Sequence, residues 1–191
     1  LATVADDDKV FIWNTDTSEC SRELVGHERT VFSIAYSPDG ITLVSASFDL
    51  TCRLWNVANG TELRIFRGAT DEIWHVVFSP DGYTFATSGN DRINRVWHVC
   101  TGSCLKEFRG TSVAENYLFG YALAYSPDGT VIACDCFTVS VWLNNGAMTT
   151  LKIGILDVST GECVRSIDID EDLIRHLAFR PPLPRDSIPS S

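Results

Sequence analysis

The chain has 191 residues, of which 45% are hydrophobic and 10% aromatic, and its formal net charge is −10. This length can bury a sizeable core, and the composition is ordinary for a globular β protein. With this acidic excess, no basic surface for a phosphate backbone is apparent, so nucleic acid is not an expected partner. No run of about 18 apolar residues and no signal-peptide pattern occurs, so no membrane association is expected and the cytoplasm or nucleus is the predicted location.

The chain opens with three short β-rich runs, Leu1 to Val4, Val10 to Asn14 and Cys20 to Val25. Turn-forming residues separate them, which favours strands. The next run, Val31 to Tyr36, leads into Ser37-Pro38-Asp39-Gly40. Proline fixes φ, aspartate can hydrogen-bond its own backbone, and glycine tolerates positive φ. We therefore expect a tight reversal here, followed by a strand from Ile41.

The same tetrapeptide returns at Ser79 to Gly82 and at Ser126 to Gly129, and a decayed form is Phe179-Arg180-Pro181. The prolines of these four copies are 42, 47 and 54 residues apart. A period near 40 residues indicates one supersecondary unit that is repeated.

A second mark recurs downstream of the turn, where an aspartate precedes a tryptophan by six residues. The pairs are Asp7 and Trp13, Asp49 and Trp55, and Asp91 and Trp97. Aliphatic or β-branched residues lie between them, which predicts a third strand ending in tryptophan. A glycine turn follows, and a fourth strand is expected to open at Leu63, Cys104 or Cys163. Four antiparallel strands per unit are typical of a propeller blade.

Within the first complete unit, Val25-Gly26-His27, Tyr36 to Gly40, Ser45, Asp49 and Leu54-Trp55-Asn56 resemble one full WD repeat. The resemblance covers essentially the whole chain and is specific, because several marks recur in one order at fixed offsets. It implies an all-β WD-repeat β-propeller. The number of expected strands, three full repeats plus split terminal strands, indicates about four blades, whereas similar families usually form rings of about seven. The expected units are 1–26, 27–68, 69–110, 111–168 and a partial 169–180, before a Pro/Ser-rich tail or linker at 181–191.

The resemblance also implies a hydrogen-bond relay that ties the loop before a blade to its second and third strands. The complete copy would be His27, Ser45, Asp49 and Trp55. The second repeat keeps Thr87, Asp91 and Trp97 but has Ala69 at the histidine position, and the opening half-repeat keeps Thr3, Asp7 and Trp13. The third full repeat has Cys134, Thr138 and Leu156 at these positions, so its blade is expected to be the loosest.

We expect these polar residues to be structural, because buried polar groups need partners and the relay supplies them. A catalytic triad requires an exposed nucleophile beside an oxyanion site, whereas Ser45 lies in mid-strand. The four histidines, at 27, 75, 98 and 176, show no ligand spacing, and Cys134-Asp135-Cys136 lacks a second pair for zinc. We therefore expect no enzyme activity, no catalytic or metal-binding residues and no cofactor.

The resemblance implies a protein-interaction scaffold that docks partner peptides or domains on one face. The family's contact positions correspond to Thr30, Phe32, Phe48, Glu72, Trp74 and Asn90. Three of them are aromatic, the type that anchors interfaces, although these rings could instead pack between blades. The alternatives are a regulatory or sensor repeat domain of a larger multidomain protein, and a propeller enzyme, which would need converging histidines or carboxylates.

Two questions stay open in the sequence. The third strand of the last full repeat ends either at Trp142 or at Leu156, and the role of the insertion at 139–153 depends on which. A strand at Leu173 to Phe179 could pair beside Leu1 to Val4 and close a four-bladed ring. The start at Leu1 in mid-repeat favours instead a fragment of a larger ring, which also makes the location provisional, and open blade edges would then invite self-association.

Overall fold

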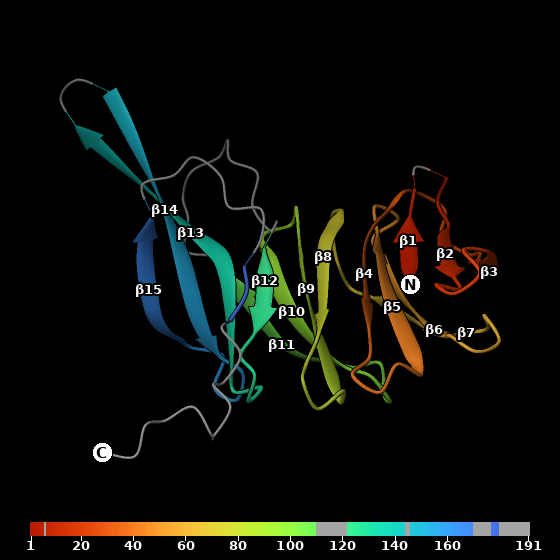
Figure 1. Ribbon diagram of the computed structural model, residues 1–191. Coiled ribbons are helices and arrows are strands. Elements are labelled where there is room, and N and C mark those ends of the chain that lie inside the picture. Colours follow the sequence, from red (N-terminus) through yellow and green to blue (C-terminus); the bar gives the residue numbers. More distant parts are fainter. Residues whose placement is uncertain (6, 110–121, 144–145, 170–176, 180–191) are drawn as a thin grey trace, which may run out of the picture.

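A computed structural model describes residues 1–5, 7–109, 122–143, 146–169 and 177–179 of the chain (Figure 1). Every element in these ranges is a β-strand, and the strands form four antiparallel sheets that stand side by side. The predicted all-β architecture of about four blades is therefore confirmed. None of the described segments forms a helix with the length and apolarity that a membrane crossing requires.

The first sheet has three strands, and the other three sheets have four each, joined in chain order. The first contains β1 (Ala2–Val4), β2 (Val10–Trp13) and β3 (Cys20–Leu24). The second contains β4 (Val31–Tyr36), β5 (Thr42–Ser47), β6 (Thr51–Asn56) and β7 (Glu62–Arg67). The third contains β8 (Ile73–Phe78), β9 (Thr84–Gly89), β10 (Ile93–His98) and β11 (Cys104–Arg109). The fourth contains β12 (Leu123–Tyr125), β13 (Val131–Leu143), β14 (Gly146–Asp157) and β15 (Cys163–Ile169).

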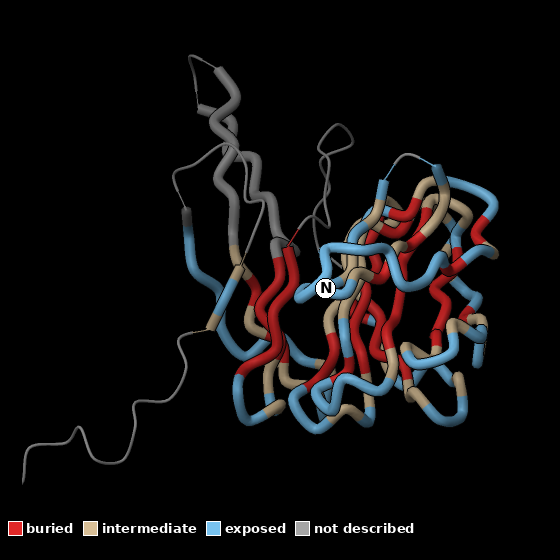
Figure 2. Tube along the Cα trace, turned by 45° about the vertical axis from the view of Figure 1, so that its right-hand side comes forward, coloured by how far each residue is buried: buried red, intermediate tan, exposed pale blue. Residues whose placement is uncertain are grey.

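Buried residues follow the strands that stand between neighbouring sheets, as the coloured trace in Figure 2 shows. Trp55 is buried with Val10 and Leu24 where the first two sheets meet, and Phe66 packs edge-on against Phe85 between the second and third sheets. A third cluster joins the third and fourth sheets. Each sheet thus buries apolar faces against its neighbours, which is how stacked repeats obtain a continuous core.

The three Ser-Pro-Asp-Gly turns adopt one conformation. In each, the glycine has a φ between 71° and 74° and its N–H donates to the serine carbonyl. The serine hydroxyl donates to the aspartate carboxylate at 2.5 to 2.6 Å. In the last copy, hydrogen bonds from the Ser126 hydroxyl and from the Thr130 N–H and hydroxyl lower the pKa of Asp128 to about 2. The turn therefore links the first and second strands of three sheets in the same way.

Strand pairing settles where the third strand of the last full repeat ends. Leu156 pairs with Cys163, as Trp55 pairs with Glu62 and Trp97 with Cys104. Leu156 therefore stands at the tryptophan position, and the insertion lengthens the β13–β14 hairpin, which projects from its sheet (Figure 1). The same register corrects the expected start of a fourth strand at Leu63. The residue equivalent to the cysteines is Glu62, because each of them follows its turn glycine by two positions.

No strand of the first sheet pairs with the fourth sheet in the described part of the chain, so the ring is not closed there. The strand expected at Leu173 to Phe179 is not found at 177–179, where no strand is assigned, and 173–176 lie outside the described residues, as does the tail at 181–191. Leu177, Ala178 and Phe179 instead line a cavity of about 410 Å³ together with the lower ends of β4, β8 and β12.

Candidate functional site

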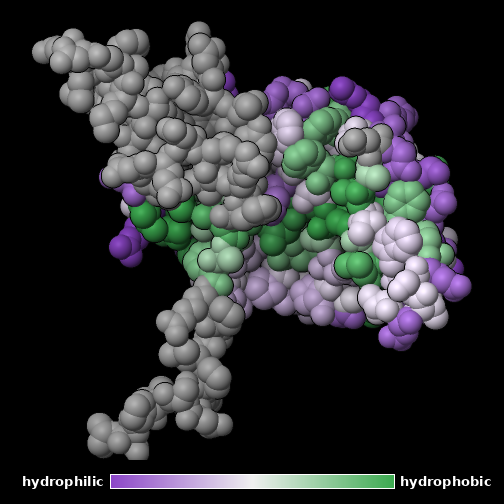
Figure 3. Space-filling model, turned by 45° about the horizontal axis from the view of Figure 1, so that its top comes forward, coloured by the Kyte–Doolittle hydropathy of each residue, from purple (hydrophilic) through white to green (hydrophobic). Residues whose placement is uncertain are grey.

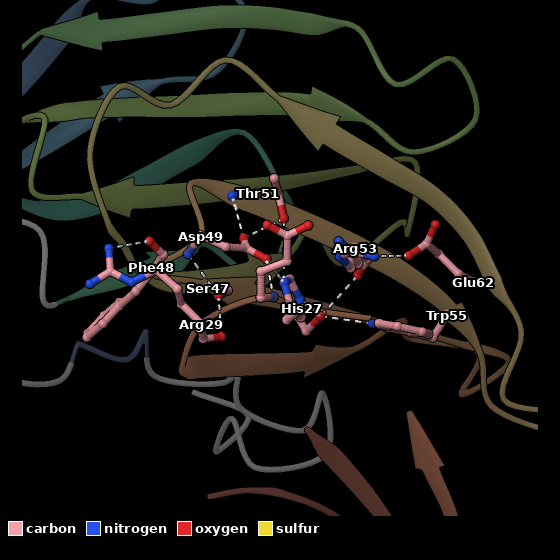
Figure 4. A network of polar contacts seen from close by, with 11 residues as sticks. His27, Arg29, Ser47, Phe48, Asp49, Thr51, Arg53, Trp55 and Glu62 are labelled. Carbon is pink, nitrogen blue, oxygen red and sulfur yellow. Dashed lines mark hydrogen bonds and ion pairs between the residues drawn. The ribbon is translucent and has the colours of Figure 1, made fainter. Parts of the chain in front are cut away.

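The most extensive polar network surrounds His27 in the second sheet (Figure 4). The Nδ1 atom of His27 lies 2.7 Å from Asp49 Oδ2, and its Nε2 atom lies 2.7 Å from Ser45 Oγ. Trp55 Nε1 donates to the same Ser45 oxygen at 2.8 Å. A carboxylate can only accept, so the histidine Nδ1 carries the proton that it shares with Asp49. The network therefore runs from Trp55 through Ser45 and His27 to Asp49.

Asp49 also organises the backbone around it. Its carboxylate accepts hydrogen bonds from the Glu28 N–H and from the Thr51 N–H and hydroxyl. Burial by itself would raise the pKa of Asp49, but the hydrogen bonds from His27 and Thr51 outweigh it and hold this pKa well below its ordinary value. Asp49 thus joins the loop before β4 to the turn between β5 and β6.

The geometry around Ser45 does not resemble an active site. Its side chain is 0% exposed, and its oxygen contacts Trp55, His27 and the Arg53 carbonyl. A nucleophile must reach substrate. In the described ranges, no group of three or more histidine, cysteine or carboxylate side chains is placed to hold a metal ion.

The second repeat contains a different network, because Ala69 stands where a histidine would be. Trp97 Nε1 donates to Thr87 Oγ1 at 3.0 Å, and the Thr70 N–H donates to Asp91 as the Glu28 N–H does to Asp49. Arg95 Nη1 then lies 2.7 Å from Asp91 Oδ2, and Arg95 Nε donates to Glu107 at 3.0 Å. The guanidinium of Arg95 therefore supplies the charge and donor that Ala69 lacks.

Arg53 occupies the position in β6 that Arg95 occupies in β10, two residues before the tryptophan. There the histidine is present, and Arg53 pairs with Glu62 instead of with Asp49. We did not anticipate either arginine from the sequence. The signal that could have found them is an arginine two residues before tryptophan in both repeats.

The relay is weaker at both ends of the chain. Trp13 Nε1 donates to Thr3 Oγ1 at 2.7 Å, but Thr3 is exposed, and Asp7 is exposed and makes no hydrogen bond to either residue in the described structure. In the fourth sheet, Cys134 and Leu156 stand where the other repeats have Ser45 and Trp55.

Three aromatic residues of the expected contact set lie together at the upper end of the second and third sheets. The ring centroids of Phe32 and Phe48 are 5.5 Å apart and those of Phe32 and Trp74 are 4.8 Å apart. Phe48 and Trp74 are separated by 4.7 Å. We call Phe32, Phe48 and Trp74 the aromatic cluster. The rings pack against one another between two sheets, yet Phe32 is still 46% exposed.

Two β-bulges position this cluster. On β4, Val31 pairs with Ser47 and Ser33 with Ala46, so Phe32 is the extra residue. On β8, Ile73 pairs with Gly89 and His75 with Ser88, so Trp74 is the extra residue. A bulge re-aims the side chain of the extra residue away from the regular alternation. The two equivalent bulges therefore bring both rings to one end of the sheets.

The other three expected contact residues surround the cluster. The Phe48 N–H donates to the Thr30 carbonyl and the Asn90 N–H to the Glu72 carbonyl, which are equivalent contacts in successive sheets. Glu72 lies 3.6 Å from Arg29, whose guanidinium also donates to the Phe48 carbonyl. In a view tilted to bring the upper end forward, hydrophobic residues gather in the middle of the described surface, and hydrophilic residues lie along its top and right edges (Figure 3).

The family model described as "WD domain, G-beta repeat" matches residues 18–56 and 60–98, which contain β3 to β6 and β7 to β10. The chain carries WD repeats. The predicted resemblance to WD repeats is therefore confirmed for these two segments, which contain most of the second and third sheets.

Similar proteins carry these WD repeats within much longer chains. The Notchless protein homolog of Arabidopsis thaliana is 39% identical over 69 residues, which is 36% of this chain and 15% of that protein. Ribosome assembly protein 4 of Saccharomyces cerevisiae is 38% identical over 68 residues, 35% of this chain and 13% of that protein. Nuclear distribution protein PAC1 of Ajellomyces capsulatus is 44% identical over 62 residues, 31% of this chain and 14% of that protein.

Proposed function

We propose that this WD-repeat chain is a non-catalytic platform on which partner peptides or protein domains dock, and that they contact the blade face that carries the aromatic cluster. The observation that carries this proposal is the pair of equivalent bulges that bring Phe32 and Trp74 together with Phe48. Aromatic side chains at the centre of a surface, surrounded by polar groups, are typical anchors of protein interfaces. Thr30, Glu72 and Asn90 would form the polar rim.

The polar networks support a structural role for the blades rather than catalysis. Ser45 and Asp49 are occupied by partners within the fold, and Asp91 is occupied by Arg95. Such networks fix the loops before β4 and β8 on rigid strands. A rigid scaffold keeps the docking residues in one arrangement and lowers the entropy lost on binding.

The names of the similar proteins are consistent with a scaffold inside the cell. Two of them refer to ribosome assembly and to nuclear distribution. We infer that this chain acts in the cytoplasm or nucleus and that its partners are proteins. Nucleic acid is not proposed as a partner, since the chain has a net charge of −10.

Site-specific photo-crosslinking in cells tests the proposal. A photo-reactive phenylalanine analogue is placed at Phe32 and, as the matched control, at Tyr83, an exposed aromatic residue after the turn at the opposite end of the third blade. We expect protein adducts from position 32 and none of the same proteins from position 83. Equal adducts from both positions would contradict a docking face at the aromatic cluster.

A further inference from the structure

The aromatic cluster is closed to a ligand that must insert between rings. Its three centroid distances are all 5.5 Å or less, which is the separation of rings in direct contact. A cation held between aromatic rings needs a space that these rings already fill. A partner must therefore lie on the outer side of the cluster, against the exposed part of Phe32.

The charged side chains in the loops at this end of the blades are mainly acidic. Acidic residues occur in the loops before β4 and β8 and in the loop between β1 and β2, which is equivalent to the loop that carries Phe48. In these loops the acidic residues are Asp7, Asp8, Glu28, Asp71 and Glu72, and the basic residues are Lys9, Arg29 and Arg92. Two further bases, Arg67 and Arg109, end the outer strands β7 and β11 at the same end of the blades.

Two of these bases are neutralised locally. Lys9 pairs with Glu23 at 2.9 Å, and Arg29 lies 3.6 Å from Glu72. The carboxylates of Asp49 and Asp91 do not contribute to the rim, because His27 and Arg95 hold them inside the fold. Glu28 is exposed, and Asp71 accepts hydrogen bonds only from neutral donors, the Glu72 N–H and the Asn90 amide. Glu28 and Asp71 therefore carry negative charge that no ion pair in the described structure compensates.

We infer that the partner segment of this face is basic, with an apolar side chain that covers Phe32 and lysine or arginine residues on both sides that face Glu28 and Asp71. This inference rests on the proposed function and specifies its partner. The negative field of a chain with net charge −10 favours the approach of such a segment over an acidic one. The aromatic cluster supplies the apolar contact and the rim supplies selectivity by charge.

Two synthetic peptides test this inference directly. They share a central Phe-Leu pair and differ only in their flanks, which are lysine in one and glutamate in the other. Binding of each to the full chain is measured by calorimetry at low salt, near 50 mM, and at high salt, near 500 mM. We expect the lysine peptide to bind about tenfold more tightly at low salt, and we expect this preference to shrink at high salt. Equal binding, preference for the glutamate peptide, or binding of neither would overturn the inference.

Matched variants locate the effect on the surface. Phe32→Ser should weaken the lysine peptide strongly, whereas Tyr83→Ser should not. Glu28→Lys should reduce the preference for lysine flanks, whereas Glu162→Lys makes the same charge change on an exposed turn of the fourth blade and should not. A preference that Glu162→Lys removes as well as Glu28→Lys would show a net-charge effect and would overturn the assignment to this rim.

The crosslinking experiment distinguishes a failure of this inference from a failure of the proposed function. If crosslinks from position 32 identify partners whose contacting segments are acidic, the docking face stands and the basic partner is wrong. If position 32 gives the same adducts as position 83, the docking face itself is wrong.

Discussion

Arg95 and Asp91 form a buried ion pair, 2.7 Å from Nη1 to Oδ2, in the place where the preceding repeat has a histidine beside its aspartate. Both side chains are almost fully buried, at 3% and 4% exposure. The pair therefore lets the second repeat lose its histidine without leaving a carboxylate unpaired in the fold.

Removing this arginine should be severe. We expect Arg95→Ala to lower the free energy of unfolding by about 3 to 5 kcal/mol, because it leaves Asp91 buried without its cation. Denaturant unfolding measures the change, and Arg67→Ala, which removes an exposed arginine from an outer strand, is the control. Adding Ala69→His to Arg95→Ala should recover part of the loss by rebuilding the relay. No recovery in the double variant would mean that Arg95 does not substitute for the histidine.

Ser45 should stabilise the fold, because its hydroxyl contacts both Trp55 and His27. In Ser45→Ala the Trp55 N–H and the His27 ring lose a common partner inside the fold, so we expect a loss of about 1 to 3 kcal/mol in the free energy of unfolding. Thr15→Ala, which removes a hydroxyl from an exposed turn, should change it by less than about 0.5 kcal/mol. Similar values for the two variants would contradict a buried network at Ser45.

Asp49 gives the network a defined pH dependence. Its pKa is lower in the folded chain than in the unfolded chain, so its ionised form stabilises the fold above the ordinary aspartate pKa of about 3.9. This stabilisation is lost as the pH falls below that value towards the folded pKa. We therefore expect the difference in unfolding midpoint between the wild type and Asp49→Asn to be constant near neutral pH and to shrink below about pH 4.

The same comparison with Asp16→Asn, on an exposed turn, controls for the general effect of removing a negative charge. If the difference between the wild type and Asp49→Asn grows as the pH falls, this would contradict a lowered pKa of Asp49 in the folded chain.

Gly89 links the fold to the proposed docking face. A Cβ atom at this position would lie 2.4 Å from the Glu72 carbonyl oxygen, beside the bulge that carries Trp74. Gly89→Ala should therefore lower the free energy of unfolding by about 1 to 3 kcal/mol through overpacking. It should also weaken peptide binding, since β8 must shift. Leu63→Ala, a substitution at an exposed residue of an outer strand, should leave peptide binding unchanged. Equal binding by the two variants would contradict a role of the Trp74 bulge in peptide binding.

The sequence predicts those features that depend on local chemistry at fixed offsets. Pro38, Asp39 and Gly40 specify the turn, and the contact of the Trp55 side chain with Ser45 lies within one hairpin, in which Trp55 pairs with Leu43. The orientation of Arg95 could not be predicted in this way, because a long side chain can point to either of two carboxylates, as Arg53 shows. The bulges at Phe32 and Trp74 depend on one surplus residue per strand, which only the register reveals.

The last full repeat shows the same limit. Both Trp142 and Leu156 satisfy a β-rich pattern, and only the pairing of Leu156 with Cys163 distinguishes them. Matching Leu63 instead of Glu62 with Cys104 is a register error of one residue, and such an error assigns every side chain of the strand to the opposite face.

Quantitative recovery of bound proteins from cells tests most directly whether partners recognise the aromatic cluster. The wild type, Phe32→Ser and Tyr83→Ser chains are compared at equal amounts of folded protein, checked by thermal unfolding. We predict that Phe32→Ser loses a set of partners that the wild type and Tyr83→Ser both retain. Retention of every partner by Phe32→Ser, or an equal loss with Tyr83→Ser, would contradict the claim.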